Sequence, residues 1–535
     1  MMMMKHKNAR AILASSLSMT TMMRTDSMIA RLTLTVIPEP ELEFANSERS
    51  EYAKDGLFLF GPTEDAGKPK SLRFGVIGTS EGIRYFHDWA NSIRGYIPAY
   101  DATKAHHFAF PGFEATFGTV FPEKPLATLT VKKSEIDLAV RLVHAYERVR
   151  TTVQIYANEL IRHNREEDEH PDFWFVVIPE IVYKRCRKES TVPFPDRIQG
   201  QQTTSMHQAK RLLTSPDLFA DVNQAAELYL FENNFHNQLK AVLLGKTVVQ
   251  VVRETTLAPD MPANINDYGF RIRNVQDDAT IAWNLCTTAF FKAQGKPWKI
   301  ADVRPGVCYV GIVFKKVDMD AHDGNACCGA QLFLNSGDGL VFKGAVGPWY
   351  SETDREFHLK DGKARELMET VISAYTRSHG SPPIEVFIHG RARFSREEWT
   401  EFQEAIPSGT KLTGIRISNG NDLKLFRLGK HPPLRGTFYK VHERLGYLWT
   451  RGFIPRLATY PGWEVPNPVS VRVDWGEADI QHVAKDIMAL TKVNFNACLF
   501  GDGLPVTLRF ADAVGEILTA APDITDAPLP FRYYI

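Results

Sequence analysis

The chain has 535 residues, of which 44% are hydrophobic and 24% are charged, a composition typical of globular proteins with sizeable cores. Lys plus Arg and Asp plus Glu both total 63, so the net charge is zero, which excludes a histone-like polycation. A local basic channel stays possible, because nucleic-acid affinity follows the local arrangement of Lys and Arg. At about 150 residues per domain, the length predicts two to four domains.

The cysteines and the N-terminal segment indicate where the protein works. The six cysteines are scattered and form no C-x-x-C pair, which indicates reduced thiols in the cytoplasm. No apolar run approaches the roughly 20 residues needed to span a bilayer, so we expect no contact with a membrane. Residues 1–32 are rich in Met, Ser and Thr and carry no acidic residue before Asp26. We expect them to form a disordered extension, in preference to a targeting peptide.

Strands and helices alternate in the first half of the chain. Alternation at 32–37 predicts the strand that opens the folded part, and a strand at 74–79 runs through a tight turn into a helix at 81–89. The apolar run 173–179 predicts a strand buried on both faces of a parallel sheet. The other expected elements are a strand at 247–252 and helices at 137–161, 181–187, 225–244 and 281–291. This order is typical of an α/β sandwich.

After Trp298 the pattern changes to several successive strands. We expect strands at 307–314, 330–334, 339–343, 384–388, 412–418, 436–441 and 445–450, and helices at 363–376, 395–404, 479–491 and 508–519. Ser395, with Glu398 three residues further on, predicts a capping box at the start of one of these helices. Strands followed by alternating α and β elements outline an RNase H-like fold.

Four residues of the first half suit a terminal phosphate. His236 and Lys240 lie four apart on one face of an expected helix, Gln250 lies in the next strand, and Lys292 lies near the end of the following helix. A phosphate dianion favours two cationic groups and neutral donors, and an imidazole ring can stack on a base. Taken singly, such a histidine is more often a core or surface residue and such lysines are usually solvated. Their common order favours the phosphate site.

Several stretches of the chain resemble prokaryotic Argonaute proteins. The order His236, Lys240, Gln250 and Lys292 is similar to the guide-binding motif of Argonaute MID domains, and the expected strands 309–314 and 384–394 resemble the PIWI half. The resemblance covers nearly all of the folded chain and is closest in short Argonautes paired with a TIR-APAZ protein. It implies an α/β architecture with a Rossmann-like MID domain followed by an RNase H-like PIWI domain, without PAZ or N domains. The N-terminal segment and MID domain would occupy 33–300, and the PIWI domain 301–535.

On this resemblance, the four residues hold the 5′ end of a guide. His236 would stack on the first base, while Lys240, Gln250 and Lys292 would bind its phosphate. A magnesium ion would assist, partly through the C-terminal carboxylate of Ile535, since the ending 531–535 is apolar and aromatic as expected for a buried terminus.

The resemblance also implies a PIWI domain that does not cut. Where slicing members carry aspartates after the two strands, this chain has Val313 and Arg391, and only Asp512 keeps an acidic group at the last position. The glutamate of the slicing tetrad has no clear counterpart near 344–348. Two-metal hydrolysis needs several carboxylates around paired ions, so one acid is insufficient. Arg391 and Arg393 would instead contact nucleic-acid backbone phosphates, although a solvated role stays open.

The family implies an immune sensor built from two proteins. Guide RNA and single-stranded target DNA would pair in this chain, and the pairing would activate the NADase of a TIR-APAZ partner in a heterodimer that forms a higher oligomer. A sirtuin-like-APAZ partner is the alternative. Other readings are a nuclease that draws carboxylates from Asp302, Asp318 or Asp320, a structural partner that binds no nucleic acid, and a dinucleotide-binding protein suggested by the glycines at 75, 78 and 82.

Overall fold

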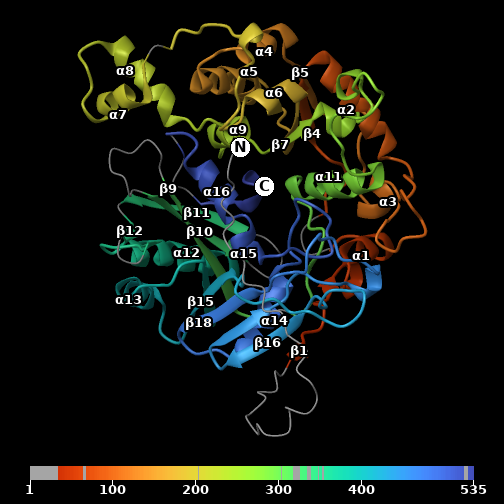
Figure 1. Cartoon of the computed structure of the whole chain (residues 1–535), viewed down its shortest axis with the longest axis vertical. Helices are drawn as coiled ribbons and strands as arrows, with labels where there is room; N and C mark the ends of the chain where they lie inside the picture. Colours follow the sequence, from red (N-terminus) through yellow and green to blue (C-terminus); the bar gives the residue numbers. More distant parts are fainter. Residues whose placement is uncertain are drawn as a thin grey trace, which may run out of the picture.

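The computed structural model describes residues 34–63, 68–202, 204–302, 304–316, 326–333, 339–347, 349–351, 355–522, 524 and 528–535. The extension expected at 1–32 lies outside the described residues, as do Asp318 and Asp320. Two large sheets organise the described part, one of four strands and one of ten (Figure 1). We call them, with their helices, the four-stranded unit and the ten-stranded unit. Within the described residues, no helix is both long and apolar enough to cross a membrane.

The four-stranded sheet is wholly parallel and has helices on both faces. Its order is β5-β4-β6-β7, with bounds Ala127–Thr130, Phe74–Gly78, Phe173–Ile178 and Val249–Arg253. Every residue of β6 is buried, as the continuous apolar run predicts. Phe175 packs in the core that includes α2 (Ser80–Ser92), and Trp174 packs in the core of α5 (Ala145–Glu166) and α9 (Phe235–Leu243).

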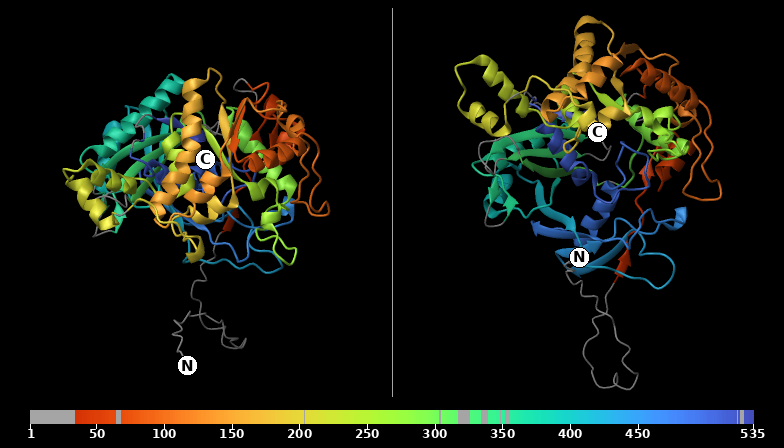
Figure 2. Two further views of the ribbon diagram at one scale, coloured as in Figure 1. Left: turned by 90° about the horizontal axis from the view of Figure 1, so that it is seen from above. Right: turned by 45° about the horizontal axis from the view of Figure 1, so that its top comes forward.

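Three of the expected helices are broken, and these predictions were wrong in this respect: the one at 508–519 divides into α15 (Val506–Arg509) and α16 (Ala511–Leu518), and the other two lie in this unit. The pattern at 137–161 divides into α4 (Lys133–Ala139) and α5, because the buried guanidinium of Arg148 holds the carbonyls of Leu142 and Val143 at 2.8 and 3.1 Å. The pattern at 225–244 divides into α8 (Ala220–Glu227), a short 3-10 turn and α9, which begins at Asn234 as its cap. Figure 2 shows α8 and its neighbour α7 (Met206–Thr214) projecting from the four-stranded unit.

The other helices of this unit lie close to their expected places. α6 spans Glu180–Arg185, and α11 spans Asp278–Lys292. Smaller elements complete it, namely α1 (Ala53–Leu59), α3 (Phe113–Phe117) and α10 (Glu254–Leu257). The cysteines whose side chains are described, Cys186, Cys286, Cys308 and Cys498, are buried and free.

The ten-stranded sheet is mixed, with its parallel part at the centre. Its order is β1-β16-β17-β18-β15-β14-β9-β10-β11-β19. The bounds, in that order, are Leu34–Val36, Thr437–His442, Leu445–Leu448, Val469–Trp475, Lys411–Asn419, Glu385–Gly390, Val307–Lys316, Ala326–Phe333, Gly339–Gly347 and Leu529–Pro530. β14 runs parallel to both β9 and β15. The seven strands expected after Trp298 are confirmed, whereas β18 and the short β19 were not predicted.

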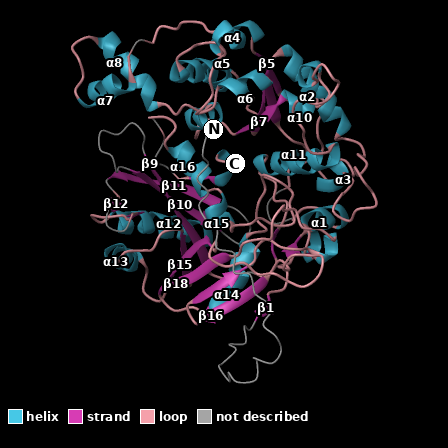
Figure 3. Ribbon diagram, viewed as in Figure 1, coloured by secondary structure: helices cyan, strands magenta, loops and turns pink. Residues whose placement is uncertain are grey.

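Helices cover both faces of this sheet (Figure 3). Alternate residues of β9 serve the two faces: Val310 packs with α12 (Lys363–His379) and α13 (Arg396–Ala405), and Tyr309 packs with the opposite core. That opposite core contains α14 (Ile480–Leu490), α15 (Val506–Arg509) and α16 (Ala511–Leu518). The capping box of Ser395 and Glu398 is present at the start of α13, as predicted.

The N-terminal segment joins the two units. β1 pairs with β16 in the ten-stranded sheet, and the chain then builds a small sheet of β3 (Arg49–Ser50), β2 (Leu42–Glu43) and β8 (Lys299–Ile300). Between β1 and β2, Glu39 binds the Nε of Arg435 at 3.0 Å and the Nζ of Lys492 at 2.7 Å. Since Arg435 and Lys492 are buried, this network fixes the segment onto the ten-stranded unit.

Candidate functional site

The four residues singled out from the sequence lie on three elements, and two of them, Lys240 and Lys292, contact the last residues of the chain. His236 and Lys240 lie on α9, Gln250 lies in β7, and Lys292 is the last residue of α11. Asn234 caps α9 by accepting hydrogen bonds from the amides of His236 and Asn237 at 3.1 and 3.4 Å. Figure 1 places the C-terminus next to α11, between the two units.

Both lysines are buried and directed at the C-terminal main chain. Lys240 is 4% exposed and donates from Nζ to the carbonyl oxygen of Tyr534 at 3.0 Å. Lys292 is 0% exposed and donates to the carbonyl oxygen of Val249 at 2.6 Å and to the main-chain oxygen of Ile535. The structure therefore brings Lys240 and Lys292 to the last two residues of the chain. The contact of Lys240 with Tyr534 joins residues 294 apart, and that of Lys292 with Ile535 joins residues 243 apart.

Burial destabilises the charged form of both lysine ammonium groups. It lowers the pKa of Lys240 to about 7, and it lowers the pKa of Lys292 well below its ordinary value, with the charge of Lys240 adding to the effect. Desolvation and the Lys240 charge also lower the pKa of His236, which favours a neutral ring at the exposed start of α9. A bound anion would offset all of these costs, so the pocket is electrostatically suited to one.

Gln250 completes the pocket with an unused acceptor. Its Nε2 makes only a long 3.4 Å contact to the carbonyl oxygen of Val251, and its buried Oε1 has no hydrogen-bond partner among the described residues. Buried polar atoms in folded proteins are almost always paired. The orphaned oxygen therefore marks a place where a ligand, a cation or a water molecule can supply the partner.

A polar network next to His236 was missed from the sequence. Asn237 donates from Nδ2 to Glu232 at 3.1 Å and to Glu516 of α16 at 3.0 Å, and Lys315 of β9 pairs with Glu516 at 3.2 Å. Burial raises the pKa of Glu232 to about 7. The network connects the start of α9 to the ten-stranded unit. The Asn237–Glu516 contact joins residues 279 apart, so no spacing in the sequence could reveal it.

The second place of interest lies at the carboxyl ends of β9 and β14. His389 of β14 pairs in register with Gly311 of β9; Arg391 directly follows β14, and Val313 lies two residues further along β9. A side chain at Gly311 would come within 2.0 Å of the carbonyl oxygen of Thr507, which explains why only glycine fits there. The side chain of Val313 is outside the described part of the structure.

Arg391 and Asp512 form an ion pair at these strand ends. The Nη1 of Arg391 lies 3.1 Å from Asp512 Oδ2, and the two side chains are 49% and 69% exposed. A cavity of about 190 Å³ opens beside the pair and is lined by both partners and by Arg393, Ile312 and Phe394. The guanidinium group of Arg391 therefore lies next to the carboxylate of Asp512.

No alternative set of carboxylates gathers at the strand ends within the described chain. Asp302 pairs instead with Arg49 of β3 at 2.9 Å. The residues that the structure describes contain no group of three or more His, Cys, Asp or Glu side chains placed to hold a metal ion. The strand ends therefore offer an arginine–aspartate pair and an open cavity as their described chemistry.

The arrangement of these sheets is the fold of Argonaute proteins. No family model matches the chain. In sequence, the chain is 22% identical over 237 residues to the Argonaute protein of Aquifex aeolicus (strain VF5), a match covering 44% of this chain and 31% of that protein. The sequence is thus similar to part of an Argonaute protein, and the solved structures below share its fold.

Three solved structures share the fold. Clostridium butyricum Argonaute bound to a guide DNA and a 19-mer target DNA matches with a TM-score of 0.55 and 15% identity, covering 92% of this chain and 53% of that one. Aa-Ago with externally bound siRNA matches at 0.52 and 15%, covering 94% and 56%. Aquifex aeolicus Argonaute matches at 0.50 and 14%, covering 92% and 53%. The chain spans about half the length of these structures.

Proposed function

We propose that the chain binds a guide RNA and senses a complementary single-stranded DNA, and that it does not cut the DNA. In this proposal the four-stranded unit is a MID domain, the ten-stranded unit is a PIWI domain, and the protein is a short prokaryotic Argonaute. The observation that carries the proposal is the pair of buried lysines, Lys240 and Lys292, converging beside Ile535.

The pocket would hold the guide by its 5′-phosphate. A phosphate dianion between Lys240 and Lys292 would make charge-assisted hydrogen bonds and relieve the cost of two buried ammonium groups. The amide of Gln250 would bond to the remaining phosphate oxygens or to an accompanying cation. His236 is exposed on the first turn of α9, where a neutral imidazole can stack on the first base.

A magnesium ion fits this pocket if it arrives with the phosphate. Mg²⁺ favours oxygen ligands, and the pocket has two: the orphaned Oε1 of Gln250 and the main-chain oxygen of Ile535. The phosphate oxygens would complete the set and would offset the two lysine charges. When bound, the ion would neutralise phosphate charge, so its role would be in guide affinity.

The strand ends support target sensing in preference to cleavage. Two-metal hydrolysis requires carboxylates that hold two cations about 4 Å apart. Arg391 instead pairs with Asp512, and a guanidinium repels a metal ion in the same place. Arg391 and Arg393 line a cavity where they can contact backbone phosphates, which hold a duplex without reading its sequence.

The partner we propose is a TIR-APAZ protein, with a sirtuin-like-APAZ protein as the alternative. The support is the resemblance of this sequence to short Argonautes found with such partners. Guide–target pairing would then activate a NADase on the partner chain, in the cytoplasm, within a heterodimer that forms a higher oligomer.

Nucleic acid bound to the purified complex tests the proposal. The chain is expressed with the protein encoded beside it, and the bound nucleic acid is extracted, sized and tested for a 5′-phosphate. We expect short 5′-phosphorylated RNA, and NAD consumption only after a complementary DNA strand is added. A complex that contains no oligonucleotide, or that cleaves the added strand, would contradict the proposal.

A further inference from the structure

A second and larger cavity lies next to the one at the strand ends. Its volume is about 470 Å³, and its walls include Glu356, His358, Arg393, Arg396, Arg416 and Trp475. Arg393 and Phe394 line both cavities, so the two adjoin. This larger cavity, which we call the arginine pocket, belongs to no part of the function proposed above except through Arg393.

The walls of the arginine pocket are held by packing. The Nε1 of Trp475 donates to the carbonyl oxygen of Phe394 at 2.9 Å, and the Trp475 ring stacks on Trp399 with centroids 5.8 Å apart. α13 begins at the pocket, where Ser395 and Glu398 form the capping box. The site is therefore built on fixed elements, as a binding site requires.

Positive charge exceeds its counter-ions in the arginine pocket. Arg416 pairs with Asp474 at 3.2 Å, and the same carboxylate faces Arg393 and Arg472. Within the described part of the chain, the side chains of Arg393 and Arg396 form no hydrogen bond or ion pair.

Two other acids lie near the pocket, and neither forms an ion pair with an arginine side chain in the described part of the chain. Glu356 accepts a hydrogen bond from the main-chain amide of Arg393 at 3.0 Å. The buried Glu398 lies 3.5 Å from His358 and takes part in the capping box. Two guanidinium groups are thus left to bind an external anion.

We propose that the arginine pocket binds a phosphate group. Guanidinium groups match phosphate oxygens with two parallel hydrogen bonds, and three arginines on different elements can surround one phosphate. The phosphate belongs either to the backbone of a strand that also passes Arg391 or to a free mononucleotide. The first source rests on the proposed function, because it requires a nucleic-acid strand at the strand ends.

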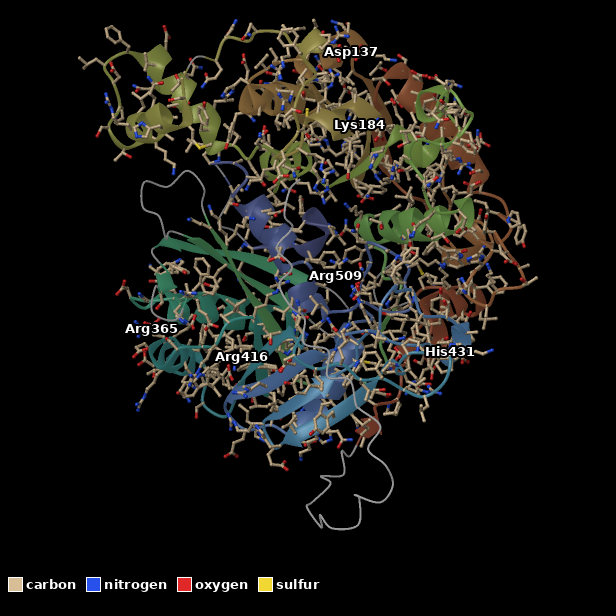
Figure 4. All side chains as sticks on the ribbon, in the orientation of Figure 1. Asp137, Lys184, Arg365, Arg416, His431 and Arg509 are labelled. Atoms are coloured by element: carbon tan, nitrogen blue, oxygen red, sulfur yellow. The ribbon has the colours of Figure 1, made fainter. Side chains whose placement is uncertain are left out.

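Two arginine variants of the full chain, with its partner and guide, test the pocket. Arg396→Ala removes an exposed cation, and Arg416→Lys keeps the charge next to Asp474 but loses the planar fork, so both should fold. Arg365→Ala on α12 is the matched control, because it removes an exposed arginine that pairs with Glu404 and lines no described pocket (Figure 4). Binding of a complementary single-stranded DNA is measured across salt concentrations.

We expect Arg396→Ala to weaken strand binding and to lower the slope of log affinity against log salt by about 0.7 to 0.9, the contribution of one phosphate contact. Arg416→Lys should weaken binding at unchanged slope, and Arg365→Ala should leave both unchanged. Adenosine monophosphate is titrated as the second probe. Saturable binding of this nucleotide that Arg396→Ala abolishes would identify a free nucleotide as the ligand, whereas strand effects alone would identify backbone phosphate.

The inference is overturned if Arg396→Ala leaves the affinities for the DNA strand and for adenosine monophosphate unchanged. It is also overturned if Arg365→Ala weakens strand binding as much as Arg396→Ala does. The preference for a guide with a 5′-phosphate over one with a 5′-hydroxyl is measured in the same samples. Absence of that preference in the unaltered protein would contradict the proposed function, while retention of it in the arginine variants separates the two questions.

Discussion

Positive charge is balanced differently at two places, the lysine pocket formed by Lys240, Lys292 and Ile535, and the strand ends where Arg391 pairs with Asp512. Lys240 and Lys292 are almost fully buried and donate to main-chain oxygens, of which that of Ile535 belongs to the C-terminal carboxylate. Arg391 is half exposed and already paired with a carboxylate. The first place holds two buried cations with one carboxylate beside them, so an added anion can still be bound. At the second place the arginine and the aspartate balance each other in contact with water.

We infer from this difference that the lysine pocket anchors the guide and that the strand ends contact the target. An anion that binds between Lys240 and Lys292 gains an attraction that burial strengthens, and it shares Lys292 with the C-terminal carboxylate. An anion at the strand ends must compete with Asp512 for Arg391 in a solvated setting, where such pairs contribute little. We therefore expect tight, permanent binding at the lysine pocket and weak, salt-sensitive binding at the strand ends.

The largest effect should come from removing both buried lysines. In Lys240→Met with Lys292→Met, two charge-assisted contacts to the guide phosphate are lost. Since each is worth about 1.5–3 kcal/mol, the affinity for a 5′-phosphorylated guide should fall by at least about 100-fold. Methionine fills similar space without a buried charge, so the protein should keep its fold. The measurement is guide binding by fluorescence anisotropy, with a thermal melt as a check of folding.

Lys184→Met is the matched control for the lysine variant. Lys184 lies on α6 of the same unit, is exposed, and is labelled in Figure 4. Its replacement should leave guide affinity unchanged. A folded double variant that still prefers a 5′-phosphate over a 5′-hydroxyl would show that the lysines do not bind the phosphate.

The next largest effect is a pH dependence with two opposite signs. Burial lowers the pKa of Lys240 to about 7, and a bound phosphate should raise it again. Guide binding then takes up a proton, so affinity is fully present below pH 7 and falls as the pH rises, by up to about tenfold per pH unit. The phosphate itself is a dianion throughout this range, because its second pKa is about 6.

The empty protein should respond in the reverse direction. A lysine whose folded pKa lies below its unfolded value binds fewer protons when folded, so the stability of the guide-free chain should rise as the pH rises from 7. Lys492, with its pKa lowered by burial to about 8, adds to this trend, so the comparison is with Lys240→Met. Affinities and melts of both proteins between pH 7 and 8.5 check the prediction, and parallel curves for the two would refute it.

A moderate effect on target binding is expected when either residue of the Arg391–Asp512 ion pair is replaced. Arg391→Ala should weaken target binding by several-fold and lower the salt slope by about 0.7 to 0.9 per lost phosphate contact, while guide binding stays unchanged. Asp512→Ala should strengthen target binding slightly, since it frees Arg391. Anisotropy of a labelled target on the guide-loaded complex measures both. Equal losses in the two variants would mean that the ion pair holds local structure and that Arg391 does not bind the target.

Local patterns predicted much of the fold, and failures occurred where distant contacts decide. The run 173–179 predicted β6 because a strand covered on both faces is apolar throughout. The helix expected at 137–161 breaks where Arg148 binds carbonyls that a continuous helix would use, which no periodicity reveals. β18 was missed although it lies between β17 and β15 in the sheet.

Local spacing also predicted part of the candidate site, and contacts between distant residues decide the rest. Spacing brought out His236 and Lys240 because they share one helical face, and the structure places Lys292 near enough to interact electrostatically with both. The contacts of the lysines with the C-terminal main chain and the Arg391–Asp512 pair join residues more than 100 apart, which only the folded chain brings together. The arginine pocket likewise draws on residues 356–358, on the segment 393–396 at the start of α13, on Arg416 of β15 and on Trp475 of β18.

The smallest expected effect is on stability, and it tests how far the strand ends have neutralised themselves. Asp512→Ala removes one partner of a pair whose side chains are 49% and 69% exposed, so the free energy of unfolding should change by no more than about 0.5 kcal/mol. Asp474→Ala is the contrasting variant, because that carboxylate is 6% exposed beside Arg416, and its loss should cost several times more. Denaturant unfolding of the two variants measures the difference. A large loss in Asp512→Ala would mean that the pair supports the ends of β14 and α16, and Arg391 would then be a structural residue with no charge available for a target strand.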